Sequence, residues 1–153
     1  MKQNKVQELY ENYFDTIYRI CFLYMKNESD SCDMVQETFL KLMQAQVQFE
    51  SEEKAKAWLI ITASNLCKSA LRKVWRKKRV GYDENMYPEQ AAEEQSQVLE
   101  LVKSLEDKYG IPVYLYYYEG YQTGEIAKML GSNPSTIQTR LAKARKLLRM
   151  ELE

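Results

Sequence analysis

Short polar side chains followed by cations occupy one face of the segment 134–149, near the end of the chain. Its outward-facing side chains are Ser135, Thr139, Lys143 and Lys146, with Thr136 and Gln138 on the flanks. Hydroxyl and amide groups near a helix N-terminus can hydrogen-bond base edges in the major groove, and cations farther along can bind phosphates. This order of groups predicts a helix that reads DNA. The alternative is an amphipathic surface helix with ordinary lysines.

The residues just before that segment favour the DNA-reading interpretation. Counted from Thr123, the fifth position is the small Ala127, the ninth is Gly131 and the fifteenth is Ile137. A helix-turn-helix needs a small residue where its helices cross, a turn that tolerates positive φ, and an apolar side chain beneath the second helix. The sequence therefore predicts a helix pair over 123–153 that contacts duplex DNA, with Thr123 as the cap of its first helix.

A second row of side chains suited to nucleic acid runs along a helix expected over 54–79. Its members are Trp58, Thr62, Asn65, Arg72 and Arg76, and Phe49 lies in the polar loop before them. Aromatic groups combined with cations can hold unstacked bases against a surface that tracks the backbone. The alternative is that Trp58 belongs to the core and that 68–79 is a solvated helix end. The residues alone leave both interpretations open.

Asp33 and Glu37 lie four positions apart on one face of a helix, as paired catalytic carboxylates do. A solvated acidic face explains them better than an acid–base pair or a metal site, because no cluster of further ligands accompanies them. The chain has no His, and its three Cys lack the spacing of metal ligands. It also lacks a Gly-rich phosphate loop and a nucleophile elbow. We therefore expect neither enzymatic activity nor a metal or cofactor.

The elements that must position these side chains are all helices. Apolar residues recur at helical spacing over 5–26, from about residue 29 to 46, over 54–79 and again after residue 98. Ser29 or Asp30 can cap the second helix, which we expect to bury Val35, Phe39, Leu42 and Met43. A short Tyr-rich helix is expected over 111–119. No alternating pattern of a strand persists, so we predict an all-α fold.

We expect two small helical domains, 1–80 and 97–153, joined by a flexible linker over 81–96. The linker segment loses the helical period and contains Gly81 and Pro88. The formal net charge is zero, but the cations are concentrated in 68–79 and 140–149, which creates local basic surfaces. No long apolar run suggests a membrane span, so we expect a cytoplasmic protein.

Two parts of the chain together resemble one family. DMVQETFLKLMQ (33–44) and KAWLIITASNLCKSALRKVWRKKR (56–79) resemble the second conserved region of bacterial sigma-70 family factors. LVKSLEDKYGIPVYLYYYEGYQTGEIAKMLGSNPSTIQTRLAKARKLLR (101–149) resembles their fourth region. A chain with only these two regions and a short linker is similar to the extracytoplasmic-function (ECF) subgroup.

The resemblance implies a role for each group of residues. It implies that core RNA polymerase is bound, at the clamp helices of the largest subunit, by Asp33, Gln36, Glu37 and Lys41. It implies that the loop 48–54, with Phe49, captures a flipped base of the −10 element, helped by Trp58, Thr62 and Asn65, while Arg72 and Arg76 hold the backbone. It implies that the −35 element is contacted by Ser135, Thr136, Gln138, Thr139, Arg140, Lys143 and Arg145. Gln138 stands where a basic residue is frequent in the family, so the −35 sequence is not transferable from relatives.

The resemblance also implies partners. These are core polymerase, at its clamp helices and flap, promoter DNA, and an anti-sigma factor, which in this family is often anchored in the membrane. It implies nucleoid association when the chain is bound to polymerase. Two other classes stay open: a helix-turn-helix repressor or activator whose N-terminal helices dimerise, and a protein adaptor without DNA contact.

Overall fold

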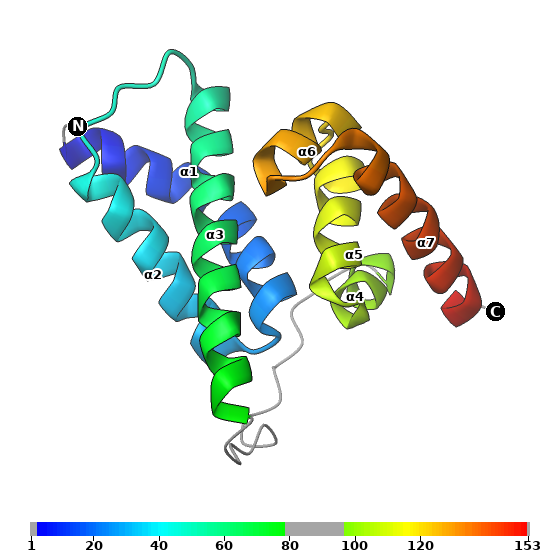
Figure 1. The fold of residues 1–153 in the computed structure, drawn as a ribbon. Coiled ribbons are helices and arrows are strands. Elements are labelled where there is room, and N and C mark those ends of the chain that lie inside the picture. Colours follow the sequence, from blue (N-terminus) through cyan, green and yellow to red (C-terminus); the bar gives the residue numbers. More distant parts are fainter. Residues whose placement is uncertain (1–2, 79–96, 153) are drawn as a thin grey trace. The chain divides into compact units, whose positions relative to one another are not determined.

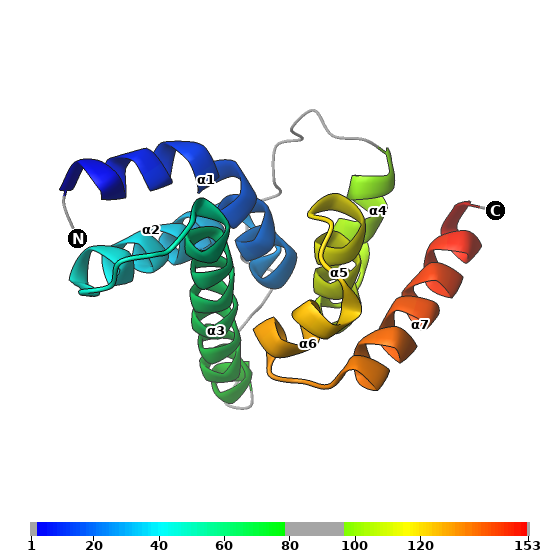
Figure 2. The same ribbon diagram turned by 90° about the horizontal axis from the view of Figure 1, so that it is seen from above.

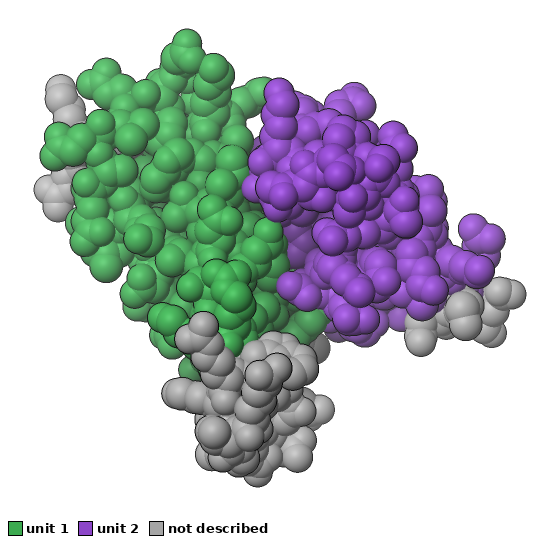
Figure 3. Space-filling model, in the orientation of Figure 1, with its two compact units in different colours: residues 1–90 green, residues 91–153 purple. Residues whose placement is uncertain are grey.

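The computed structural model describes residues 3–78 and 97–152, with side chains for 4–73 and 99–149. The chain divides into two compact units, Met1–Gln90 and Ala91–Glu153 (Figure 3). Within the described ranges every regular element is a helix, which confirms the predicted all-α fold of two helical domains. The predicted linker, 81–96, lies outside the described residues. None of the described helices is long and apolar enough to cross a membrane.

Unit 1 is a bundle of three helices, α1 (Gln3–Met25), α2 (Glu28–Gln44) and α3 (Glu52–Lys78) (Figures 1 and 2). Each of the three contacts the other two. Their shared core consists of fully buried apolar side chains, among them Leu9, Ile17, Ile20, Leu42, Leu59 and Ala63. Burying such side chains stabilises the bundle by roughly 1.5–3 kcal/mol each for the larger ones. The bundle leaves the outer faces of α2 and α3 available for other contacts.

The second helix is capped by Asn27, not by the predicted Ser29 or Asp30. Lys26 has a φ of +66°, which ends α1, and Asn27 follows in an extended conformation. Its Oδ1 then accepts a hydrogen bond from the backbone N–H of Asp30 at 2.8 Å. Ser29 and Asp30 lie inside the first turn, where the negative charge of Asp30 still favours the helix dipole. The same helix ends at Gln44 and not at Gln46.

The start of α3 is tied to α1 by Glu52. Its Oε1 accepts a hydrogen bond from the Tyr13 hydroxyl at 3.2 Å, and its Oε2 lies 3.6 Å from Lys5 Nζ. Burial raises the pKa of Tyr13, and the carboxylates of Glu52 and Glu53 raise it further. The Ser51 hydroxyl accepts a hydrogen bond from the backbone N–H of Lys54 and so caps α3. These contacts hold the end of the loop that carries Phe49.

Unit 2 contains α4 (Gln97–Ser104), α5 (Asp107–Val113), a π-helical turn η2 (Tyr114–Tyr118), α6 (Thr123–Leu130) and α7 (Pro134–Leu152). The Tyr-rich helix begins four residues earlier than predicted, and Pro112 lies inside α5 rather than near its start. Because Pro lacks an N–H, the helical ladder is weakened there, and η2 follows directly. Gly110 permits close packing on α4, since a Cβ at this position would lie 3.2 Å from the Val102 carbonyl oxygen.

The predicted helix-turn-helix is formed by α6 and α7. Gly131 has a φ of +66°, and the N–H of Ser132 donates to the Ala127 carbonyl at 2.8 Å, which closes a Schellman turn. Ala127 is buried at the crossing and Ile137 is fully buried beneath α7, as expected. The predicted cap Thr123 is wrong, because it is already helical. Gln122 precedes it, and its N–H donates to Glu125 Oε1 at 2.8 Å.

Candidate functional site

The outer face of α2 carries Asp33, Gln36, Glu37 and Lys41, and all four side chains are exposed. Two large apolar side chains share this surface, Leu40 at 46% exposure and Met43 at 55%. The expectation that Met43 is buried is therefore wrong. An exposed apolar group costs solvation free energy unless something covers it, so this face has the composition of a protein-binding surface.

A groove of about 570 Å³ lies between α2 and α3. Its α2 side is formed by Asp33, Met34, Gln36, Glu37 and Leu40, and its α3 side by Leu66, Ser69, Ala70 and Lys73. Three of the four predicted polymerase-binding residues therefore line one concave site, whereas Lys41 does not line it. Sequence reasoning missed Leu40, Leu66 and Lys73. A helical pattern shows which face a residue occupies but not which residues of another helix stand opposite it.

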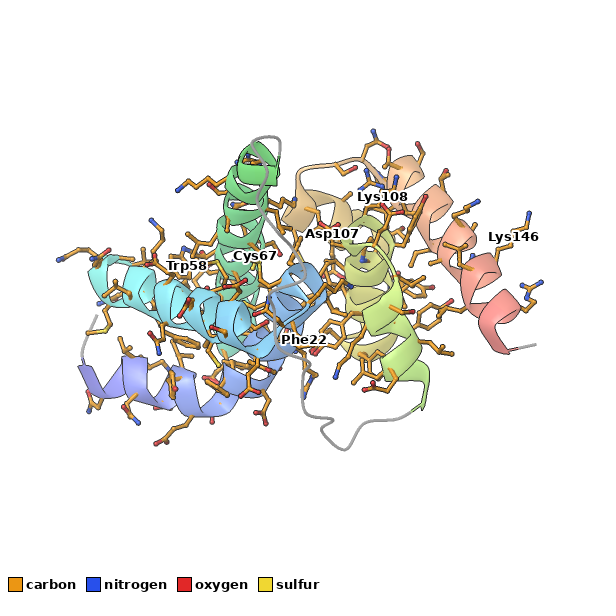
Figure 4. All side chains as sticks on the ribbon, turned by 90° about the horizontal axis from the view of Figure 1, so that it is seen from below. Phe22, Trp58, Cys67, Asp107, Lys108 and Lys146 are labelled. Carbon is orange, nitrogen blue, oxygen red and sulfur yellow. The ribbon has the colours of Figure 1, made fainter. Side chains whose placement is uncertain are left out.

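The predicted −10 residues whose side chains are described lie in the loop before α3 and along α3. The Phe49 ring contacts the Trp58 indole with centroids 5.9 Å apart and an interplanar angle of 61°. Trp58 lies on α3 (Figure 4), half-buried, and Thr62 follows one turn later in the same state. Asn65 and Arg72 are exposed farther along the same face. The side chain of Arg76 lies outside the described part of the chain.

Trp58 is thus neither fully buried nor fully solvated. Its indole contacts Phe49, and the residue as a whole keeps part of its surface accessible. Aromatic rings in such a position offer a stacking surface, and each stacked base adds about 1–3 kcal/mol to binding. The row therefore begins with aromatic groups and continues with an amide and a guanidinium.

The outward face of α7 has the expected order of groups. Ser135, Gln138, Thr139 and Lys143 are exposed, and Thr136 and Arg140 are half-buried. Lys146 projects from α7 away from α5 (Figure 4). On the opposite side Ile137, Leu141 and Ala144 are buried, while Leu148 is half-buried. The helix therefore has one apolar face held by unit 2 and one polar face open to a ligand.

Asn133 is a second determinant of this face that the sequence analysis missed. Its Oδ1 accepts the backbone N–H of Thr136 at 2.9 Å and the Ser135 hydroxyl at 3.1 Å. The Thr139 hydroxyl donates to the Ser135 carbonyl at 3.0 Å. The protons of both hydroxyls are thus directed to the protein, and their oxygen lone pairs face outward as acceptors. The signal for Asn133 was its position before Pro134, a common start of a helix.

Arg145 projects from the flank of α7 toward η2. Its Nη1 donates a hydrogen bond to the Tyr117 hydroxyl at 3.0 Å, across 28 residues of sequence. Tyr117 is 53% exposed, and its ring meets the Tyr116 ring edge to face with centroids 4.9 Å apart. The structure thus places the predicted residue Arg145 beside a tyrosine that sequence reasoning did not single out.

The cysteines take no part in these surfaces. Cys21 and Cys67 are buried in unit 1, and Cys32 is half-buried. A hydrogen bond to Cys67 and burial raise the pKa of Cys21, so its thiol stays protonated. Burial also raises the pKa of Cys32. Within the described residues no group of acidic or sulfur ligands is arranged to hold a metal ion.

A helix-turn-helix whose second helix keeps an open polar face is the arrangement of a DNA-binding protein, and here a second helical unit accompanies it. The family model for sigma-70 region 2 matches residues 9–77, and that for sigma-70 region 4 matches residues 95–148. The chain belongs to the sigma-70 family of RNA polymerase sigma factors, in its ECF group. It is accordingly a transcription initiation factor and not an enzyme, and the repressor alternative is not favoured.

Individual relatives agree with this assignment. The chain is 31% identical over 139 residues to the RNA polymerase sigma factor SigV of Bacillus subtilis (strain 168), covering 88% of this chain and 83% of that protein. It is 26% identical over 172 residues to the ECF sigma factor SigW of the same organism, covering 98% and 90%. Among solved structures, the sigma factor RpoE in its co-crystal with the anti-sigma factor NepR from Bartonella quintana matches with a TM-score of 0.78, at 20% identity and 99% and 98% coverage. That structure supports the fold.

Proposed function

We propose that this sigma factor binds core RNA polymerase, directs it to promoters with defined −35 and −10 elements, and assists DNA melting. Residues 1–80 bind polymerase and the −10 element, residues 97–153 read the −35 element, and residues 81–96 connect them. The contact between Phe49 and Trp58 carries the proposal furthest. It joins the loop to α3 in one partly open aromatic surface, next to the polar and cationic groups that a melted strand requires.

The polymerase contact is assigned to the groove between α2 and α3. Asp33 and Glu37 supply negative charge there, while Leu40 and Leu66 supply apolar surface. A helical partner with basic and apolar side chains complements such a groove. The clamp helices of the polymerase largest subunit, which the family resemblance implies, are that partner. The flap is the corresponding partner of the second unit.

The −35 contact is assigned to the open face of α7. Ser135 and Thr139 enter the major groove as hydrogen-bond acceptors, because their protons are already bound by Asn133 and by the helix backbone. Acceptors pair with the amino groups of adenine or cytosine. Gln138 can both donate and accept, and Lys143 binds phosphate. Arg140 and Arg145 support these contacts to the DNA.

Flipping a base out of the stack costs a few kcal/mol. Stacking on Phe49 and Trp58, together with backbone contacts from Arg72 and Arg76, offsets that cost. Binding through two separate units adds a gain in effective concentration, because each bound unit keeps the other near its element.

An anti-sigma factor that masks the chain until it is needed completes the proposal. The similar RpoE was crystallised with the anti-sigma factor NepR, which supports a protein inhibitor of this class. The family resemblance implies that the inhibitor of this chain is anchored in the membrane. The sigma factor itself acts in the cytoplasm, on the nucleoid when bound to polymerase.

The test is transcription in vitro with purified core polymerase from the same organism and a genomic library of promoter fragments. Addition of the chain should produce run-off transcripts of defined length from a small set of fragments, and core polymerase alone should not. Absence of any specific transcript would overturn the proposal. The Asp33→Lys/Glu37→Lys variant separates this function from a repressor, since only a sigma factor loses activity through failure to bind core.

A further inference from the structure

The hydrogen bond between Arg145 and Tyr117 connects two elements of unit 2 at its surface. Arg145 Nη1 donates a hydrogen bond to the Tyr117 hydroxyl oxygen at 3.0 Å. The Tyr117 ring is itself held by an edge-to-face contact with Tyr116, at an interplanar angle of 81°. Both members of the pair are exposed. A hydrogen bond to a tyrosine that is itself held by a neighbouring ring therefore restricts the long Arg145 side chain.

Among the described side chains, none neutralises the charge of Arg145. Within the described side chains, no carboxylate lies within ion-pair distance of its guanidinium, and Tyr117 is its hydrogen-bond partner. A guanidinium has five N–H donors in a planar fork, and the bond to Tyr117 uses one of them. The remaining donors match the two oxygens of a phosphate, which is a frequent ligand of arginine.

The position of Arg145 on α7 indicates which phosphate is in reach. Arg145 follows Gln138 by seven residues, which is two helical turns or about 10 Å along the same flank. Gln138 is exposed on the face that we assign to the base pairs of the −35 element. A cation two turns farther along the helix meets the strand that borders the major groove, and not the base edges.

We propose that Tyr117 is a positioning residue that holds the Arg145 guanidinium for one phosphate of the promoter strand beside the −35 element. This inference rests on the proposed function. It adds to the DNA-binding surface a side chain of η2, outside the helix-turn-helix. The hydroxyl acts through the arginine, so its contribution is independent of the base sequence.

The experiment uses holoenzyme made from the full chain and core polymerase. The probe is a duplex that wild-type holoenzyme selects from a randomised DNA library. Tyr117→Phe keeps the ring and removes only the hydroxyl, and it should weaken binding roughly fivefold on matched and mismatched −35 sequences alike. Arg145→Gln should weaken binding further and lower the magnitude of the salt slope by about 0.9, the value for one lost phosphate contact.

The double variant shows whether the two side chains act as a unit. In the Arg145→Gln background, Tyr117→Phe should change affinity by less than about twofold, since the group that it positions is gone. Tyr109→Phe, which removes a half-buried phenol hydroxyl elsewhere in the unit, is the matched control and should bind like wild type. Thermal unfolding of each variant checks that the fold is intact.

The outcomes are distinct. Wild-type affinity for Tyr117→Phe, or an undiminished effect of Tyr117→Phe in the Arg145→Gln background, would overturn the inference and leave the proposed function standing. A Tyr117→Phe variant that binds the duplex normally but loses affinity for core polymerase would also overturn it, because the tyrosine then serves a protein contact. Failure of wild-type holoenzyme to select any duplex would overturn the proposed function, and the inference with it.

Discussion

The Phe49 and Trp58 rings lie in edge-to-face contact, so a loop residue and a helix residue nine positions apart form one aromatic surface. Neither ring is fully buried. Such a pair is worth about 0.5–1.5 kcal/mol beyond the area it buries, which orders the loop before any ligand arrives. The loop end is held in addition by Ser51 and Glu52. A preordered loop costs less entropy when it takes up a base.

Replacement of Trp58 by Ala should impair promoter opening more than promoter binding. Loss of one stacking surface of about 1–3 kcal/mol corresponds to a roughly five- to 150-fold decrease in the yield of open complex. Permanganate reactivity of thymines in the −10 element measures that yield. On a template whose −10 element is already unpaired, transcription should return toward the wild-type level. Equal losses on both templates would show that the variant damages folding or core binding instead.

Reversal of charge in the groove between α2 and α3 should weaken the polymerase contact without unfolding unit 1. Asp33 and Glu37 are exposed, so Asp33→Lys/Glu37→Lys should change the free energy of unfolding by less than about 0.5 kcal/mol per site. Affinity for core polymerase should fall at least about tenfold, because like charges then face each other. Fluorescence anisotropy with labelled chain measures this affinity.

The control for that variant is Asp15→Lys, which makes the same charge change as each of the two groove substitutions, on an exposed position of α1 outside the groove. It should bind core polymerase like wild type. If Asp15→Lys and the groove variant weaken binding equally, general charge and not the groove would account for the loss.

Two replacements of Asn133 should separate stability from DNA binding. Asn133→Ala removes the acceptor at the start of α7 and should destabilise unit 2 by about 1 kcal/mol. Asn133→Asp keeps an acceptor of similar capping strength and should unfold near the wild-type temperature. Its added negative charge near the DNA phosphates should still weaken binding. Calorimetry measures the stability of both variants, and a duplex-binding assay measures their affinity for DNA. An Asn133→Ala variant as stable as wild type would contradict the prediction.

Ser64 should be a stabilising site when replaced by Ala. Its hydroxyl is buried in unit 1 and has no hydrogen-bond partner among the described residues. An unsatisfied buried hydroxyl costs about 1–3 kcal/mol, so Ser64→Ala should raise the midpoint of thermal unfolding. Ser69→Ala, half-buried on the same helix, gains only helix propensity and serves as the control. An equal rise of the unfolding midpoint in both variants would show that the unsatisfied Ser64 hydroxyl is not the cause.

Local sequence chemistry predicted most helices and the helix-turn-helix. The roles of Ala127, Gly131 and Ile137 follow from the geometry of a single turn, and the residues stand close together in the chain. The caps were harder to assign. Asn27 competes with Ser29 and Asp30, and only the backbone conformation after Lys26 decides which side chain reaches the free N–H groups. The start of α5 was predicted too late for a similar reason, because Pro112 is tolerated inside a helix that packs closely on α4.

What the sequence alone determined is therefore the order and type of the helices, the polar faces of α2, α3 and α7, and the resemblance to the sigma-70 family. These depend on periodicity and on short-range steric limits. The tertiary structure decided which faces meet. It brought Leu66 and Lys73 opposite Glu37, and it placed Tyr117 against Arg145 across 28 residues. Such contacts depend on the packing of segments far apart in the chain, which a one-dimensional pattern does not specify.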